Sequence, residues 1–259
     1  MGLKLALCQY QAEIGNVSAN LNRIMTTLSQ TKSDVYIFPE LFLTGYGADC
    51  SSLSEEVQYA IDRMRLWCLE MDVAILVGAP SYRSNGVRNS LLFISSGETV
   101  RYDKMYPARS GVCSEKGFMK GDKPMLCSFK GMTFGLSICY DIFFPEILRS
   151  YALAGADINI CIAASAIQTK PYYDRILPAR SLENLFYTVF VNGIGVSGDQ
   201  RFYGSSRLIG PLGNTISELG SGEEVRCVYV DKEVIINARK ENKHLDDRRI
   251  DINWRLDSL

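Results

Sequence analysis

The chain has 259 residues, with 28 Lys and Arg against 29 Asp and Glu, so its formal net charge is -1. Nucleic-acid-binding proteins concentrate positive charge in one patch, and this balanced chain has no basic run, so we expect no nucleic-acid partner. Hydrophobic residues make up 47% of the chain and charged residues 22%, which excludes a disordered or collagenous protein. The length and composition predict one globular domain over residues 1–259.

The N-terminal apolar stretch, residues 3–8, is too short for the core of a signal peptide and predicts a buried first strand. No apolar run in the sequence reaches the length of a membrane span. We therefore expect a cytoplasmic protein with no membrane partner.

The apolar patterns that follow alternate between strand-like and helical along the chain. They predict strands at 3–8, 35–38, 73–77, 90–94, 99–102, 125–129, 133–138, 158–163, 188–192, 206–209 and 226–230, and helices at 18–28, 55–71, 145–153 and 172–186. The last twenty residues form a charged tail of mixed sign. This alternation indicates a layered α/β protein, built either on one large sheet or on two stacked sheets.

The eight cysteines include no CxxC pair, and several lie in apolar strand-like segments. This pattern disfavours a metal site and a disulfide framework, so we expect no metal and no cofactor. A buried free thiol behaves as a small hydrophobic group, which is our interpretation of Cys8, Cys161 and Cys227.

Two familiar catalytic or binding patterns are disfavoured. The single histidine, His244, lies in the charged tail, whereas a general base is best placed on a rigid element beside its nucleophile. The sequence therefore disfavours catalytic schemes that need a histidine base. Residues 193–198 spell a dinucleotide-binding GxGxxG motif, but no helix pattern follows, so a phosphate would lack its helix N-terminus. We predict a loop there.

Three polar residues follow predicted strands directly. Glu40 has apolar neighbours, and burial among them would raise the pKa of its carboxyl towards neutrality, as a general base requires. Lys104 follows the strand at 99–102. Cys139 ends a strand near the start of a predicted helix, a position that lowers the pKa of a thiol. Taken singly, the three would equally fit a surface glutamate, a solvated lysine and a buried cysteine.

Together these segments resemble the carbon-nitrogen hydrolase, or nitrilase, superfamily, and in particular its amidase-like branch. The matching motifs are PELFLTGY around Glu40, YDK around Lys104 and GLSICYD around Cys139, followed by FFPE, PARSLEN, YGSS and DDRR. They extend from the first strand to the tail. The resemblance implies a four-layer αββα sandwich, with two sheets stacked between helical layers, and a homodimer or higher homo-oligomer that continues the sandwich.

The resemblance also implies a mechanism. Cys139 would be the nucleophile and Glu40 the general base and acid, while Lys104 and the backbone N–H of Tyr140 would hold the oxyanion. The cation beside Cys139 would favour the thiolate.

Two positions depart from the commonest family pattern. Many members carry a second glutamate that steadies the lysine and the substrate, and Glu115 is the candidate here. Its spacing to Phe118 is one residue shorter than usual. Tyr106 stands where many relatives have histidine, which changes a contact near the oxyanion site.

The CysTyrAsp sequence resembles amidases, whereas nitrilases usually carry CysTrpGlu. We therefore expect hydrolysis of a small amide, including an ω-amide, to a carboxylate and ammonia through a thioester on Cys139. Candidate substrate-binding residues are Tyr46, Tyr140, Phe143 and Ile167, although such side chains could equally be core or dimer contacts. Arg175 would fit either a substrate carboxylate or an exposed helix position.

Other functions stay open. A hydrolase of N-carbamoyl amines or of nitriles would use the same residues. A non-catalytic scaffold of this fold, or a redox sensor that uses the Cys139 thiol without a substrate, are the non-hydrolytic alternatives.

Overall fold

Two six-stranded sheets form the centre of the structure, a computed structural model that describes residues 2–108, 115 and 117–252. The strands of the first sheet are, in order, β14 (Glu224–Asp231), β1 (Gly2–Gln9), β2 (Val35–Ile37), β3 (Ala74–Arg83), β4 (Gly86–Ser95) and β5 (Glu98–Asp103). Those of the second sheet are β13 (Thr215–Glu218), β12 (Arg207–Ile209), β9 (Tyr187–Asn192), β8 (Ile158–Ala163), β7 (Met132–Ile138) and β6 (Leu126–Phe129).

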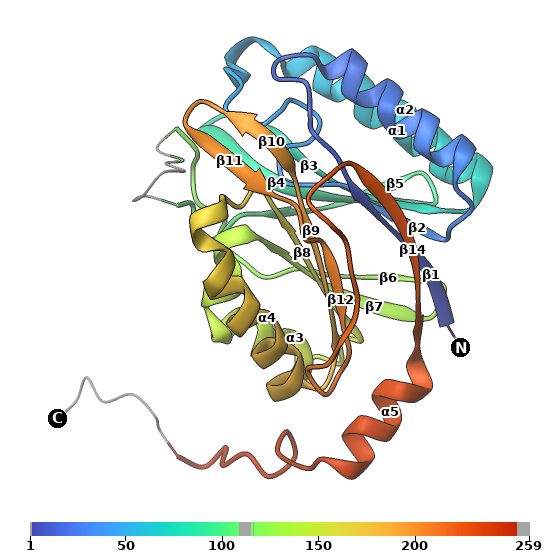
Figure 1. The fold of residues 1–259 in the computed structure, drawn as a ribbon, viewed down its shortest axis with the longest axis vertical. Helices are drawn as coiled ribbons and strands as arrows, with labels where there is room; N and C mark the ends of the chain where they lie inside the picture. The colour runs from blue at the N-terminus through green and yellow to red at the C-terminus, as the bar shows by residue number, and fades with distance from the viewer. Residues whose placement is uncertain (1, 109–114, 116, 253–259) are drawn as a thin grey trace, which may run out of the picture.

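Helices cover the outer faces of both sheets (Figure 1). The pair α1 (Val17–Gln30) and α2 (Ser54–Met71) lies on the first sheet, and the pair α3 (Pro145–Leu153) and α4 (Lys170–Asn184) lies on the second. The helix α5 (Lys232–Glu241) lies at the end of the molecule below the second pair. The described residues also include three short 3₁₀ turns: η1 (Cys50–Ser52), η2 (Cys139–Phe143) and η3 (Ile167–Thr169).

Three apolar layers hold the four structural layers together. One fills the space between the sheets, a second lies between the first sheet and its helices, and a third lies between the second sheet and its helices. Along β2, Val35 and Ile37 face the inter-sheet layer while Tyr36 faces the helices. Strands buried on both faces read as continuous apolar runs, which explains why the sequence predicted them well. The predicted αββα sandwich is confirmed, and the two-sheet alternative is the correct one.

The sequence analysis missed some of the later elements. Residues 193–198, predicted as a loop, begin a hairpin of β10 (Ile194–Ser197) and β11 (Gln200–Tyr203). No helix starts there, as expected, but the strands are short and glycine interrupts their apolar alternation: Gly195 has φ of 91°. Neither β13 nor α5 was predicted. Asp231 caps α5 by accepting a hydrogen bond from the backbone N–H of Glu233.

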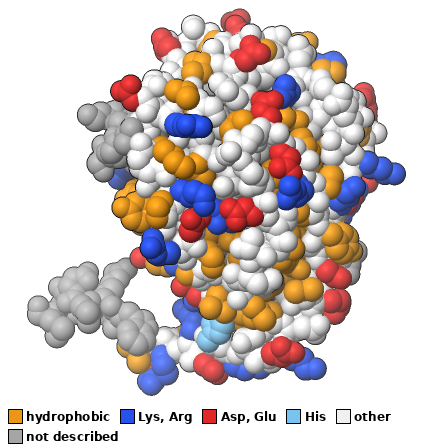
Figure 2. Space-filling model, viewed as in Figure 1, with side chains coloured by type: hydrophobic (Ala, Val, Ile, Leu, Met, Phe, Trp, Pro, Cys, Tyr) orange, Lys and Arg blue, Asp and Glu red, His pale blue; other side chains and the backbone are white. Residues whose placement is uncertain are grey.

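The surface carries charges of both signs. On the face drawn in Figure 2, side chains of Lys and Arg and of Asp and Glu are scattered among uncharged and hydrophobic ones. His244 is exposed, as predicted. Of the helices that the structure describes, none combines the length and the apolar character needed to cross a membrane.

Candidate active site

Lys104, the residue after β5, lies at the centre of a buried ion-pair network. Its side chain is 1% exposed, and its Nζ lies 2.7 Å from Glu40 Oε1 and 2.7 Å from Glu115 Oε2. Burial opposes the charge of the ammonium, but the two facing carboxylates outweigh it and hold the pKa of Lys104 well above its ordinary value. The interpretation of Lys104 as a solvated lysine is therefore wrong.

Glu40 lies in the tight turn after β2 and is buried. The turn packs against Gly78 of β3, where a Cβ would lie 2.2 Å from the backbone nitrogen of Leu41. Glu40 Oε2 accepts a hydrogen bond of 2.8 Å from the backbone N–H of Ala164, which follows β8 of the other sheet. Burial, together with the negative charge of Glu115, raises the pKa of Glu40 although Lys104 lowers it. The surface alternative for Glu40 is wrong, and the predicted direction of its pKa shift is confirmed.

Glu115 joins this network despite its unusual sequence spacing. Its side chain is 1% exposed, and Oε2 accepts hydrogen bonds from Lys104 Nζ and from the backbone N–H of Ala108, both 2.7 Å. The predicted position of Glu115 beside the lysine agrees with this geometry. Among the residues that the structure describes, no group of three or more His, Cys, Asp or Glu side chains could hold a metal ion.

Asn89 on β4 is a site residue that the sequence analysis missed. Its Nδ2 donates hydrogen bonds to Glu40 Oε1 at 2.7 Å and to Glu115 Oε1 at 2.5 Å, and the residue is buried. One amide group therefore bridges the two carboxylates that face Lys104. The only signal in the sequence is an amide at the edge of the apolar run 90–94.

Cys139 is the first residue of η2, directly after β7, and its backbone has φ of 48°. This left-handed conformation is unfavourable for any residue except glycine and is found mainly where surrounding structure enforces it. Burial of the thiol and the nearby charge of Glu40 raise the pKa of Cys139 well above its ordinary value, although Lys104 and Tyr173 lower it. Lys104 lowers this pKa, as predicted, but the expected net lowering is wrong because desolvation outweighs the effect of the lysine.

Asp141, two residues after Cys139, connects the two sides of the site. Its Oδ2 accepts from Tyr102 Oη at 2.8 Å and from the backbone N–H of Ile138 at 3.1 Å, and its Oδ1 accepts from the backbone N–H of Tyr106 at 2.9 Å. Burial raises the pKa of Asp141 to about 7. The carboxyl thus ties the turn that carries Cys139 to residues on both sides of Lys104.

Two of the predicted substrate-binding residues, Tyr140 and Phe143, lie in an aromatic cluster on η2. Tyr140 is 42% exposed and meets Phe144 edge-on, with ring centroids 5.3 Å apart. Phe144 stacks in turn on Tyr106, the residue that replaces the usual histidine. Next to Cys139 there is therefore an aromatic surface with one exposed face.

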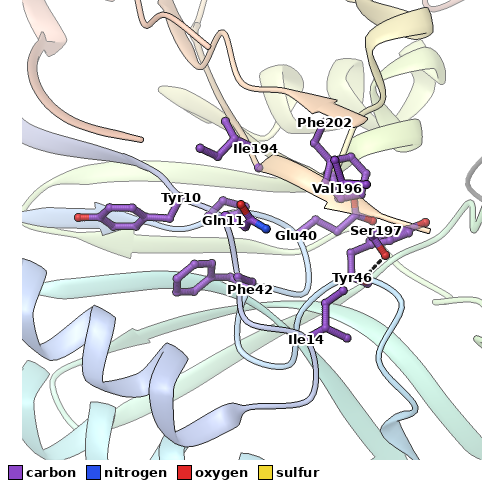
Figure 3. Close-up of a pocket in the computed structure, with 14 residues that line it drawn as sticks. Tyr10, Gln11, Ile14, Glu40, Phe42, Tyr46, Ile194, Val196, Ser197 and Phe202 are labelled. Atoms are coloured by element: carbon purple, nitrogen blue, oxygen red, sulfur yellow. Dashed lines mark hydrogen bonds between the residues drawn. The ribbon is translucent and has the colours of Figure 1, made fainter. Parts of the chain in front are cut away.

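The other candidates lie elsewhere. Tyr46 lines a pocket beside Glu40, with walls from the residues after β1 and from the β10–β11 hairpin (Figure 3). The Tyr46 ring meets Phe202 edge-on at 5.6 Å, and its backbone carbonyl accepts a hydrogen bond from Ser197 Oγ. Ile167 lies on η3 and is 45% exposed. Arg175 is exposed and donates to the backbone carbonyl of Pro171, so the exposed-helix alternative describes its position.

Comparisons with known proteins agree with this arrangement. The model of the carbon-nitrogen hydrolase family matches residues 4–240. An (R)-stereoselective amidase from a Pseudomonas species is 28% identical over 96% of this chain and 92% of its own length. A glutamine-dependent NAD(+) synthetase from Aquifex aeolicus is 29% identical over 98% of this chain, which spans 45% of that protein.

Solved structures give the same result. An amidase from Nesterenkonia sp. superimposes with a TM-score of 0.84 at 27% identity, covering 96% of this chain and 94% of that one. A structure of a variant of that amidase shows covalent addition of the acetamide moiety of fluoroacetamide at its active-site cysteine. Because the family model covers nearly the whole sequence, the chain belongs to the carbon-nitrogen hydrolase family, as its motifs predicted.

Proposed function

We propose that this protein hydrolyses a small amide to a carboxylate and ammonia through a thioester on Cys139. The observation that carries the proposal is the buried Lys104 ammonium, 2.7 Å from both Glu40 and Glu115, in a site that also holds the thiol. The similarity to the Pseudomonas amidase supports an amide substrate. A 2-oxoglutaramate amidase from Bacillus subtilis, 25% identical over 96% of this chain, extends the candidates to ω-amides.

Formation of the thioester begins with a proton transfer. Burial keeps the Cys139 sulfur protonated at rest, so the Glu40 carboxylate removes the proton as the sulfur attacks the amide carbon. Negative charge moves to the amide oxygen, where the Lys104 ammonium and the backbone N–H of Tyr140 stabilise it. Loss of one such donor typically costs about two to three orders of magnitude in rate.

The same groups act in the breakdown of the tetrahedral intermediate and in the hydrolysis of the thioester. The carbon–nitrogen bond breaks as Glu40 returns its proton to the nitrogen, and ammonia leaves. Glu40 then removes a proton from water, whose oxygen bonds to the thioester carbon. The carbon–sulfur bond breaks, and the sulfur recovers a proton from Glu40.

A nitrile is the second candidate substrate. A nitrilase from Pyrococcus abyssi is 29% identical over 98% of this chain and all of its own length. The same sulfur would then form a thioimidate in place of a tetrahedral amide adduct. An N-carbamoyl amine, which would release carbon dioxide with an amine, stays an alternative.

The test is ammonia release from a panel of simple amides, ω-amides, N-carbamoyl amines and nitriles. We expect turnover of at least one amide by the wild type and none by Cys139→Ala. The half-buried Cys227→Ala is the matched control and should retain the wild-type rate. Full activity in Cys139→Ala would refute the thioester, and turnover of nitriles alone would replace the amidase by a nitrilase.

The proposal includes the physical state of the protein. We expect residues 1–259 to act as one domain, as a homodimer or a higher homo-oligomer, in the cytoplasm. The family match over residues 4–240 supports one domain. Light scattering of the purified protein would give its mass in solution, and a monomer at micromolar concentration would contradict the expected assembly.

A further inference from the structure

Tyr173, on a helix that covers the second sheet, contacts the Cys139 sulfur. It lies near the start of α4 and is 2% exposed, and its hydroxyl oxygen is 3.2 Å from Cys139 Sγ. The ring is held between Phe143, edge-on at 5.4 Å, and Phe190 at 5.2 Å. The aromatic contacts fix the hydroxyl at the sulfur. The neighbouring Tyr172 is 59% exposed.

A buried phenol needs a hydrogen-bond partner, since an unpaired hydroxyl away from water is costly. In the part of the chain that the structure describes, Cys139 Sγ is the one hydrogen-bond partner of the Tyr173 hydroxyl. Burial and the nearby thiol raise the pKa of Tyr173 well above its ordinary value, so the hydroxyl keeps its hydrogen. Tyr173 thus always has a hydrogen that it can donate to the Cys139 sulfur.

The direction of this hydrogen bond depends on the protonation of the sulfur. While Cys139 is a thiol, either group can donate. Once Glu40 has taken the thiol proton, only the phenol has a hydrogen to share, and a hydrogen bond to a charged acceptor is stronger than one between neutral groups. The contact therefore stabilises the thiolate more than the thiol.

We propose that Tyr173 is a catalytic residue that donates its phenolic hydrogen to the Cys139 sulfur whenever that sulfur carries negative charge. This inference rests on the proposed function, because it concerns the same nucleophile. The first occasion is the attack on the amide, as the S–H proton moves to Glu40. The second is thioester hydrolysis, when the carbon–sulfur bond breaks and its electron pair stays on sulfur until Glu40 returns the proton. Tyr173 gains and loses no proton in either step.

The variant Tyr173→Phe removes one oxygen atom and keeps the ring in place. Tyr203→Phe is the matched control, because Tyr203 is also buried, also has its ring against Phe190, and makes no hydrogen bond to Cys139. Thermal unfolding of both variants would check that the fold is retained.

The first measurement uses iodoacetamide and needs no turnover. The rate of Cys139 alkylation is followed against pH by mass spectrometry of its peptide. In Tyr173→Phe we expect the profile to move to higher pH and the rate at pH 7 to fall about tenfold, since one charge-assisted hydrogen bond is lost. In Tyr203→Phe both should match the wild type. An unchanged profile in Tyr173→Phe would refute the proposal.

The second measurement is amide turnover by the same variants. We expect kcat/KM of Tyr173→Phe to fall by about one to two orders of magnitude while KM changes little. A loss of turnover without a change in alkylation would overturn the proposal, because the hydroxyl would then act on something other than the sulfur. If the wild type hydrolyses no amide but the alkylation profile moves, the role of Tyr173 at the sulfur is supported and the proposed function alone fails.

Discussion

The two sheets supply different kinds of group to one site. The first sheet carries the charges: Glu40 after β2, Asn89 on β4 and Lys104 after β5, connected by hydrogen bonds of 2.7 Å. The second sheet carries Cys139, the proposed nucleophile, and a helix packed on that sheet carries Tyr173.

An apolar layer and several hydrogen bonds join these two halves. The backbone N–H of Ala164 donates to Glu40, and Tyr102 donates to Asp141. Neither sheet forms the site alone: the first holds the charged groups, the second holds the Cys139 thiol, and the contacts between the sheets hold the two sets near each other. Substitutions on each side should therefore have different signatures.

The largest effect is expected on the charged side, from Lys104→Met. This change leaves Glu40 and Glu115 buried without their cation, and removing one partner of a buried ion pair typically costs about 3–5 kcal/mol. We expect loss of amide turnover by at least about two orders of magnitude and a lower urea midpoint. The control Lys130→Met removes a half-exposed lysine that forms an ion pair with Asp34, and it should lower the free energy of unfolding by at most about 1 kcal/mol. Equal effects of the two changes would contradict the proposed role of the network.

Asn89→Ala should act on the same side but more weakly. It removes the donor shared by the two carboxylates while the lysine stays in place. We expect about 1–3 kcal/mol of lost stability and a fall in kcat of about tenfold to a hundredfold, with alkylation of Cys139 retained. A wild-type kcat would show that Lys104 and the backbone N–H groups of Ala164 and Ala108 position the carboxylates without Asn89.

Asp141→Asn tests the contact between the halves through pH. The pKa of this carboxyl is raised by burial to about 7, so the folded protein holds a proton that the unfolded chain has already released above about pH 4. The contribution of Asp141 to the free energy of unfolding therefore falls as pH rises from about 4 to about 7, by at most about 1.4 kcal/mol per pH unit. Urea midpoints measured across this range should fall less steeply in Asp141→Asn than in the wild type. An identical slope would mean that Asp141 does not titrate in this window.

The smallest effect is expected from Arg175→Ala. Its side chain is exposed, and its one hydrogen bond in the described structure goes to the backbone carbonyl of Pro171 in the same helix. The free energy of unfolding should therefore change by less than about 0.5 kcal/mol. We expect KM to change less than about twofold for both simple amides and ω-amides that carry a carboxylate. A rise in KM confined to the carboxylate substrates would restore Arg175 as a binding residue.

Sequence patterns were sufficient to predict features that depend on residues adjacent in the chain. The strands with continuous apolar runs, and the strand-end positions of Glu40, Lys104 and Cys139, could be read directly because each depends on its immediate neighbours. The direction of the Cys139 pKa shift could not, since lysine and a helix start are visible in sequence but desolvation is not. Burial was foreseen for Glu40 because its apolar neighbours are adjacent in the chain.

The residues that sequence analysis missed act across distance. Asn89 bridges carboxylates 49 and 26 positions away, and Tyr173 meets a sulfur 34 positions earlier. No periodicity identifies a side chain whose partner belongs to another layer. The aromatic pair at 172 and 173 illustrates the point, because both have the same letter and only the helix orientation decides which one is buried.

The left-handed backbone at Cys139 has a consequence for how this protein responds to random substitution. A non-glycine residue in this conformation costs of order 1 kcal/mol or more, and glycine would adopt it freely. A library selected for thermal resistance without regard to turnover should therefore enrich glycine at position 139, while a library selected for turnover should retain cysteine there. The difference between the two libraries at this one codon would measure how much folding stability the chain loses by keeping cysteine, the proposed nucleophile, at position 139.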